Sequence, residues 1–318
     1  MAKTNIKQKN DNNWKWLIMA LLANLLFLPG GIFIKLITDE ITPSLLPVLR
    51  SGLIVLVLLP FIISGIIKYK KILKKNLKTI LLVCVACAVG PLCYAYAMSM
   101  SNVSFLAIID MFTPIAFAIM SVFIVKDKIS RNSLIGILFA IFGGIMIFVV
   151  PLLTGEGSVV VFGWIPVVLA LASMATSALW PVFLRKQNEN GLPLPMMIGI
   201  GFFFSALAAG IFTITNSGIE TFAEVGNISI TSWVMIIYLA VVFSICARLL
   251  SVKAYKRVGT ATMTTVQYLY YLSLIALPIF VLQERLSWEM FVGAGLILAG
   301  IIFTRINGHR LKSKGQKK

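Results

Sequence analysis

The chain contains ten long apolar runs, and this pattern restricts its fold more than any other feature of the sequence. Each run approaches the roughly 20 residues that an α-helix needs to cross the hydrocarbon layer of a membrane. Only 12% of the 318 residues are charged, against about a quarter in soluble domains. The sequence therefore predicts an all-α integral membrane protein. The expected spans are residues 14–37, 44–67, 77–100, 102–125, 131–150, 163–186, 193–214, 231–254, 259–282 and 287–306.

A polar turn followed by two spaced glycines occurs twice, 157 residues apart. Residues 126–130 precede glycines at 136 and 143, and residues 283–287 precede glycines at 293 and 300. Each copy lies between two apolar runs, as expected for a duplicated unit. Ten spans divide into two sets of five, and because five is odd, the second set must enter the membrane in the opposite orientation.

We therefore expect two inverted five-helix repeats. The first repeat covers residues 14–150 and the second covers residues 163–306. An external connector at 151–162 joins them, and polar tails at 1–13 and 307–318 flank them. In proteins built this way, the transport site usually lies where the repeats meet.

Basic residues concentrate in alternate loops and in the two tails. If the N-terminus is cytoplasmic, most of the 28 Lys and Arg residues fall on the inner side. The outer loops carry acids instead, at positions 39, 40, 156, 220, 224 and 284. This is the positive-inside distribution. We expect both termini in the cytoplasm and the protein in the cytoplasmic membrane. The net charge of +17 then comes from basic residues on the cytoplasmic side of the membrane and does not indicate nucleic-acid binding.

Several short motifs in the two repeats form a recognisable set. They are residues 256–261, Glu284 to Leu286, Gly293 with Ala299 and Gly300, Pro47 to Arg50, Ile34 with Lys35, Pro114 and the Asp127 turn. Over residues 14–306 the sequence is similar to the EamA branch of the drug/metabolite transporter superfamily. The resemblance implies a ten-helix transporter of organic metabolites, often amino acids or related compounds, or of drugs. Tyr271 replaces a proline usual in the family and Arg248 has no counterpart in its pattern, so no substrate is carried over.

Two polar residues occupy equivalent places in the repeats. Asp110 lies eight residues into the fourth span, about 12 Å deep and close to the midplane. The repeat offset maps it onto Gln267 in the ninth span. We expect both side chains, with Asn24 of the first span, to line a central cavity. The alternative is a polar network that only locks the helices together.

Aromatic and cationic residues add to this candidate site. Gln267, Tyr270 and Tyr271 share one helix face because they are spaced i, i+3 and i+4, and a tyrosine offers a flat apolar ring with a hydroxyl. The tyrosines could instead pack within the bundle. Arg248 could hold a substrate carboxylate or phosphate, or extend to the membrane surface.

Other residues fit gating or structural roles. The resemblance favours such a role for Arg50, and Lys35 lies near the outer face, where a lysine can extend to the surface. Pro114 can kink the fourth span, and Glu284 belongs to the outer polar turn. The spaced glycines permit close helix contact, either within one chain or between two.

These features favour a secondary transporter of an amino acid or another carboxylate-bearing metabolite, working by alternating access. The alternative is a proton-coupled exporter of lipophilic cations that uses Asp110. We see no catalytic, metal-ligand or nucleotide-binding motif, so we expect no enzyme and no cofactor. The expected partners are a small solute, the lipid bilayer and a coupled proton or counter-solute, with no nucleic acid. The protein is expected to be a monomer or homodimer.

Overall fold

The computed structural model describes residues 13–113, 116, 131–155, 162–189, 191–255 and 260–306. Within these ranges the chain is almost entirely helical and contains no strand. The elements are α2 (Asn13–Phe27), α3 (Gly30–Thr38), α4 (Leu45–Lys75), α5 (Leu77–Ser99), α6 (Val103–Asp110), α8 (Arg131–Phe148), α9 (Val150–Thr154), α11 (Trp164–Glu189), α12 (Leu194–Ser217), the 3₁₀ helix η1 (Ile219–Asn227), α13 (Ile230–Ile237), the π-helix η2 (Tyr238–Ala247), α14 (Arg248–Tyr255), α15 (Thr260–Val281) and α16 (Trp288–Ile306).

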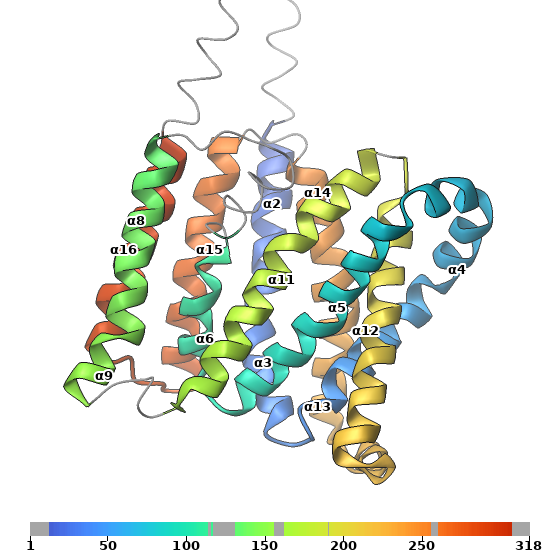
Figure 1. Cartoon of the computed structure of the whole chain (residues 1–318), viewed down its shortest axis with the longest axis horizontal. Helices are drawn as coiled ribbons and strands as arrows, with labels where there is room; N and C mark the ends of the chain where they lie inside the picture. The colour runs from blue at the N-terminus through green and yellow to red at the C-terminus, as the bar shows by residue number, and fades with distance from the viewer. Residues whose placement is uncertain are drawn as a thin grey trace, which may run out of the picture.

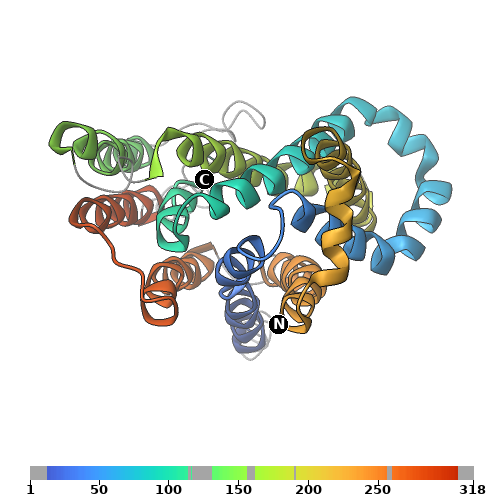
Figure 2. The ribbon, with the colours of Figure 1, turned by 90° about the horizontal axis from the view of Figure 1, so that it is seen from below.

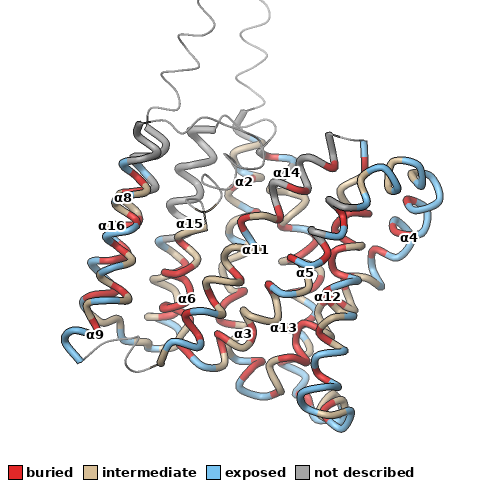
Figure 3. The backbone as a smooth tube through the Cα atoms, in the orientation of Figure 1, coloured by how far each residue is buried: buried red, intermediate tan, exposed pale blue. Residues whose placement is uncertain are grey.

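The helices have the surface of a multi-pass membrane protein. Four of them are long and apolar enough to cross a bilayer, namely Lys15–Thr38, Leu45–Lys75, Leu194–Ser217 and Ile230–Ser251, and shorter apolar helices accompany them. Large apolar side chains face outward, among them Phe280, 83% exposed, and Phe291, 66% exposed. Figure 3 shows exposed and buried residues alternating along the helices. The all-helical fold class is confirmed, whereas the count of ten spans stays a prediction because only Val103–Asp110 of the fourth span forms a described helix.

Three predicted spans differ in detail from the observed helices. The first is divided into α2 and α3 at Pro29, because proline lacks the N–H that would continue the helical hydrogen bonds. The eighth contains the π-helix η2 between α13 and α14. The second continues beyond the predicted end at 67 to Lys75, with a non-helical break at Tyr69. Its last turns are basic rather than apolar, so hydropathy alone did not reveal them.

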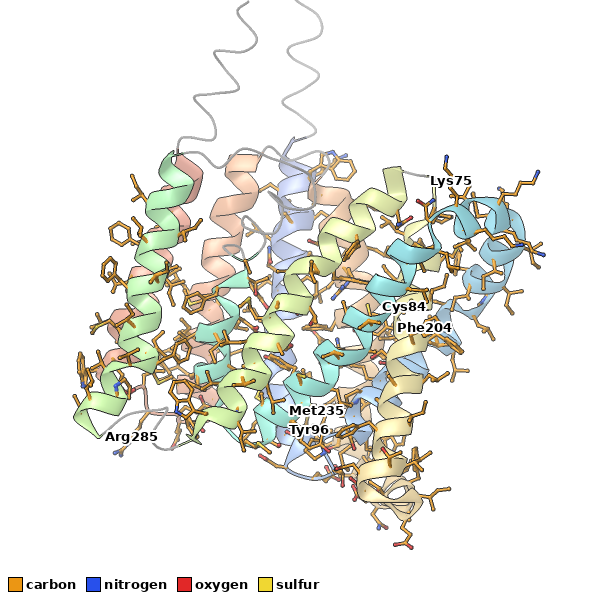
Figure 4. The ribbon with its side chains drawn as sticks, in the orientation of Figure 1. Lys75, Cys84, Tyr96, Phe204, Met235 and Arg285 are labelled. Atoms are coloured by element: carbon orange, nitrogen blue, oxygen red, sulfur yellow. The ribbon has the colours of Figure 1, made fainter. Side chains whose placement is uncertain are left out.

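The helices stand in two rows when the bundle is viewed along its helices. One row contains α8, α11 and α5, and the other contains α16, α15, α2 and α14 (Figure 2). The start of α2 and the end of α16 lie at the same end of the bundle (Figure 1). We call the opposite end, where α3 ends and α6, α13 and α16 begin, the distal face. Lys75 lies near the first end and Arg285 at the distal face (Figure 4).

The two halves of the chain are interleaved. The most extensive helix contacts join α8 to α16, α4 to α12, α5 to α11 and α5 to α12, each pair taking one helix from each half. Smaller contacts between the halves join α2 to α14 and α6 to α15. Helices α8 and α16 run in opposite directions, since α8 begins at the end of the bundle where α16 finishes (Figure 1). The apolar core therefore forms between the halves, where Phe105 and Met98 of the first half share one buried cluster with Ile236 of the second.

The repeated glycines form the contact between α8 and α16. A Cβ atom on Gly143 would lie 2.8 Å from the carbonyl oxygen of Gly293, and one on Gly293 would lie 2.9 Å from that of Gly143. A Cβ on Gly300 would lie 2.5 Å from the carbonyl oxygen of Gly136. Only hydrogen fits at such distances, as in other close helix pairs of membrane proteins. The glycines thus bring the two halves of one chain together.

Candidate functional site

A group of polar and aromatic side chains lies between the two rows of helices. Asp110, the last residue of α6, accepts a hydrogen bond from the hydroxyl of Tyr94 on α5. Tyr270 of α15 is close enough for electrostatic interaction with both groups. Asp110 has no Lys or Arg partner within the described ranges. The acid is therefore held by tyrosines from neighbouring helices rather than by a cation.

Arg50 reaches from α4 to the π-helix of the other half. Its Nε and Nη2 atoms donate to Ser244 Oγ, at 3.2 and 2.8 Å. Its guanidinium lies 5.0 Å from the ring centroid of Phe243, a cation–π distance. Tyr94 also interacts electrostatically with Arg50. Arg50 therefore connects the Asp110–Tyr94 pair to the eighth span.

The π-helix gives Ser244 and Phe243 their positions. Ser244 Oγ donates at 2.7 Å to the carbonyl oxygen of Leu239, five residues earlier, and such π-helical turns occur often at functional sites. The Phe243 ring packs edge-on against Phe27, with centroids 4.9 Å apart. It also occupies the place that a Cβ would need at Gly30. The absence of a side chain at Gly30 therefore makes room for the Phe243 ring beneath Arg50.

Arg248 lies one turn beyond Ser244, at the start of α14. Its guanidinium is 5.8 Å from the ring centroid of Trp180 on α11. Its Nε is buried and has no hydrogen-bond partner in the described part of the chain. The Cys87 thiol of α5 is its electrostatic neighbour, and no carboxylate pairs with it there. Arg248 is thus a cation next to an aromatic ring, without a counter-charge among the described residues.

The side chains of this cluster retain accessible surface although helices surround them. Arg50, Tyr94, Asp110, Arg248 and Tyr270 are all only partly buried. Apolar neighbours on the same helices, such as Ile109, are fully buried. This contrast marks the cluster as the polar part of the bundle interior.

Glutamates at the distal face connect the two halves of the chain. Glu40 of the first half accepts hydrogen bonds from the backbone N–H and hydroxyl of Ser229, at 2.5 and 3.0 Å, and from the hydroxyl of Ser232. The bonds from Ser232 and from the Ser229 N–H lower the pKa of Glu40. Glu224 of the second half accepts from the backbone N–H and hydroxyl of Thr42, both at 2.7 Å.

Glu284 forms a third connection of this kind. Its carboxylate accepts hydrogen bonds from the backbone N–H groups of Val103 and Ser104, at 2.9 and 2.8 Å. These are unpaired donors of the first turn of α6, where a negative charge is favourable. We call the hydrogen bonds of Glu40, Glu224 and Glu284 the distal links. They hold the halves together at this face.

The predicted site residues have different outcomes. The structure places Asp110, Arg50 and Tyr270 in one cluster with Arg248. The side chains of Gln267 and Tyr271, and all of Pro114, lie outside the described residues. Asn24 donates to the carbonyl oxygen of Ala20 in its own helix.

Lys35 pairs with Asp39 at 3.1 Å and donates to the carbonyl oxygen of Met98. It is therefore fixed near the distal face.

Sequence reasoning missed four residues of the cluster: Tyr94, Trp180, Phe243 and Ser244. Each lies in an apolar run, where a single Ser or aromatic residue gives no periodic signal. Their roles depend on contacts between helices far apart in the sequence. Groups of His, Cys, Asp or Glu able to hold a metal are absent from the described ranges.

Comparison with known proteins identifies the family. The profile of the EamA-like transporter family matches residues 14–149 and 164–306. No curated protein matches the sequence. A solved crystal structure, described only as that of a protein, is 16% identical with a TM-score of 0.55, and the alignment covers 93% of this chain and 98% of the other. At that identity the likeness supports a shared fold and nothing further.

Proposed function

Because the chain belongs to the EamA-like transporter family, we propose that it is a secondary transporter of an amino acid or a related carboxylate-bearing solute. Arg248 is the observation that carries this proposal. A guanidinium is costly inside a membrane unless it faces a partner or a water-filled space. Within the described ranges, Arg248 has neither a carboxylate nor a hydrogen-bond acceptor. A substrate carboxylate would supply both, because guanidinium and carboxylate geometries match.

The surrounding side chains fit the rest of such a solute. Asp110 provides a negative charge for an ammonium group, and Tyr94 and Tyr270 lie beside it. Trp180 and Phe243 provide apolar ring surface next to the two arginines. This mixture of apolar walls and a few placed polar groups is typical of small-molecule sites.

Alternating access would move the two halves relative to each other around this cluster. The distal links join the halves at one face, and on this proposal that face is the closed one and the opposite face is open. The distribution of basic residues favours the cytoplasm for the face that contains Lys75. The distal face would then be external, in the cytoplasmic membrane.

A transport assay tests the proposal. The purified protein is reconstituted into vesicles, and uptake of labelled amino acids and organic acids is measured with and without a pH gradient. We expect saturable uptake of at least one carboxylate-bearing solute, reduced about tenfold or more by Arg248→Gln. The matched control is Arg285→Gln, an exposed loop residue. Transport restricted to solutes without an acidic group would refute the proposal.

Proton-coupled export of lipophilic cations is the second candidate. It is favoured by the absence of a Lys or Arg partner for Asp110 in the described ranges and by the tyrosine rings beside this acid. On this reading, proton and cation would compete for Asp110. Asp110→Asn should then abolish cation export while amino-acid transport persists. Loss of amino-acid transport with unchanged cation export would exclude this candidate.

A further inference from the structure

The charges of the polar cluster are unequal. Two guanidinium groups, Arg50 and Arg248, accompany one carboxylate, Asp110, and neither arginine has a carboxylate partner in the described part of the chain. Glu289, a buried acid in the described ranges, belongs to α16, whose main contact is with α8 on the far side of the bundle. Lys35 is already paired with Asp39. The cluster therefore has one excess positive charge in a region where charge is costly.

The two guanidinium groups interact electrostatically. Ser244 and Arg248 are four residues apart and share one side of the eighth span. Arg50 is hydrogen-bonded to Ser244, which brings it to that same side, and the two cations repel each other. Their separation is maintained by other contacts, Arg50 on Phe243 and Arg248 on Trp180.

Both arginines keep hydrogen-bond donors for a further ligand. Ser244 engages Nε and Nη2 of Arg50, which leaves Nη1. Arg248 makes no hydrogen bond within the described ranges, and its Nε is a buried donor without an acceptor. A buried donor without a partner is rare in proteins and calls for an explanation. Donors on two interacting cations fit two acidic groups better than one.

We propose that the transported solute carries two acidic groups and one ammonium group, with one acidic group on Arg248, the other on Arg50 and the ammonium near Asp110. This inference rests on the proposed function and specifies its substrate class. A neutral zwitterion leaves one guanidinium without a counter-charge. A dicarboxylate without an ammonium group leaves Asp110 facing two more negative charges. A solute with two acidic groups and one ammonium group gives each of the three charged side chains, Arg50, Arg248 and Asp110, a partner of opposite charge.

Three solutes of similar size separate these possibilities: glutamate, glutamine and glutarate. Their binding to the purified full-length protein is measured by calorimetry. We expect glutamate to bind about tenfold or more tightly than glutamine, since one charge-assisted pair is gained. Glutarate should also bind more weakly than glutamate. In Asp110→Asn this order should change, with glutarate gaining affinity relative to glutamate.

Arg248→Gln provides the second measurement. It should remove the preference for glutamate over glutamine while glutamine still binds, which shows that the variant is folded. Arg285→Gln should leave the preference unchanged. Equal binding of glutamate and glutamine to the unmodified protein would overturn the inference and leave the proposed function intact. Binding of none of the three would also overturn the inference, whereas the proposed function is refuted only by the uptake assay described above.

Discussion

Glu284→Gln should open the distal face. The carboxylate of Glu284 accepts two backbone hydrogen bonds at the start of α6, from Val103 and Ser104. It comes from the loop before α16, in the other half of the chain. An amide keeps a single acceptor oxygen and loses the negative charge. The substitution therefore weakens a connection between the halves with little change in side-chain shape.

The expected magnitude follows from this geometry. A hydrogen bond to a charged group contributes about 1.5–3 kcal/mol, and a negative charge at a helix N-terminus contributes about 0.3–1 kcal/mol. Because glutamine preserves one bond, we expect the closed state to lose about 1–2 kcal/mol. That loss changes the ratio of closed to open molecules by a factor of about 5 to 30.

A cysteine at Ser44 reports the opening. Ser44 is fully buried near the distal face and precedes α4 rather than α6, so local fraying of α6 does not expose it. It is converted to cysteine in a background in which the four native cysteines, all free, are replaced. The measured quantity is the rate of reaction with a membrane-impermeant maleimide added from the distal side. Glu284→Gln should raise this rate about 5- to 30-fold.

Glu220→Gln is the matched control for this experiment. Glu220 is an exposed acid in η1 near the same face, and it makes no hydrogen bond within the described ranges. It therefore loses the same charge without losing a link. Equal labelling rates in the two variants would refute the argument that Glu284 holds the face closed. A higher rate at a second cysteine at Ala140, buried on α8, would reveal general unfolding instead.

Three further predictions concern packing, pH and the π-helix. Gly300→Ala should lower the free energy of unfolding, measured by denaturation, by about 1–3 kcal/mol, because the added Cβ would lie 2.5 Å from a backbone carbonyl oxygen of α8. Gly295→Ala is the control and should be neutral or stabilising, because open space surrounds Gly295. Hydrogen bonds, first of all the one from Ser232, lower the pKa of Glu40 below its usual 4.5. The distal link made by Glu40 therefore stabilises the fold fully above the unfolded-state pKa, and this stabilisation is lost as the pH falls through the folded-state pKa. Ser232→Ala should therefore lower the melting temperature at neutral pH and make its fall on acidification smaller, because the folded-state pKa of Glu40 moves back toward the unfolded-state value. An unchanged pH profile would contradict this assignment. Ser244→Ala should reduce transport and leave expression intact, because it removes the acceptor of Arg50 without changing a charge, and normal transport would show that this bond is dispensable.

The local sequence pattern and the position along the chain were enough to predict that Asp110 lies in the interior of the bundle. Hydropathy and the repeat offset predicted Asp110 as an interior residue, because an acid in a long apolar run is visible without any tertiary information. The partner of Asp110 was not predictable. Tyr94 lies on another helix, and a tyrosine in an apolar run does not differ locally from a packing residue. The same limit applies to Ser244, whose role depends on a π-helical turn that no residue pattern marks.

The sequence by itself determined the all-helical membrane fold and the repeated turn with its glycines. These depend on the length and apolarity of segments and on spacing along one chain. Only the tertiary structure decided that the glycines of α8 meet those of α16 within one chain, and that Glu40, Glu224 and Glu284 join opposite halves. It also decided that Arg248 lies on Trp180 with no counter-charge in the described part of the chain, while Lys35, equally cationic in the sequence, is paired with Asp39. The physical reason is that the cost of a buried charge depends on what surrounds it, and those surroundings come from helices distant in sequence.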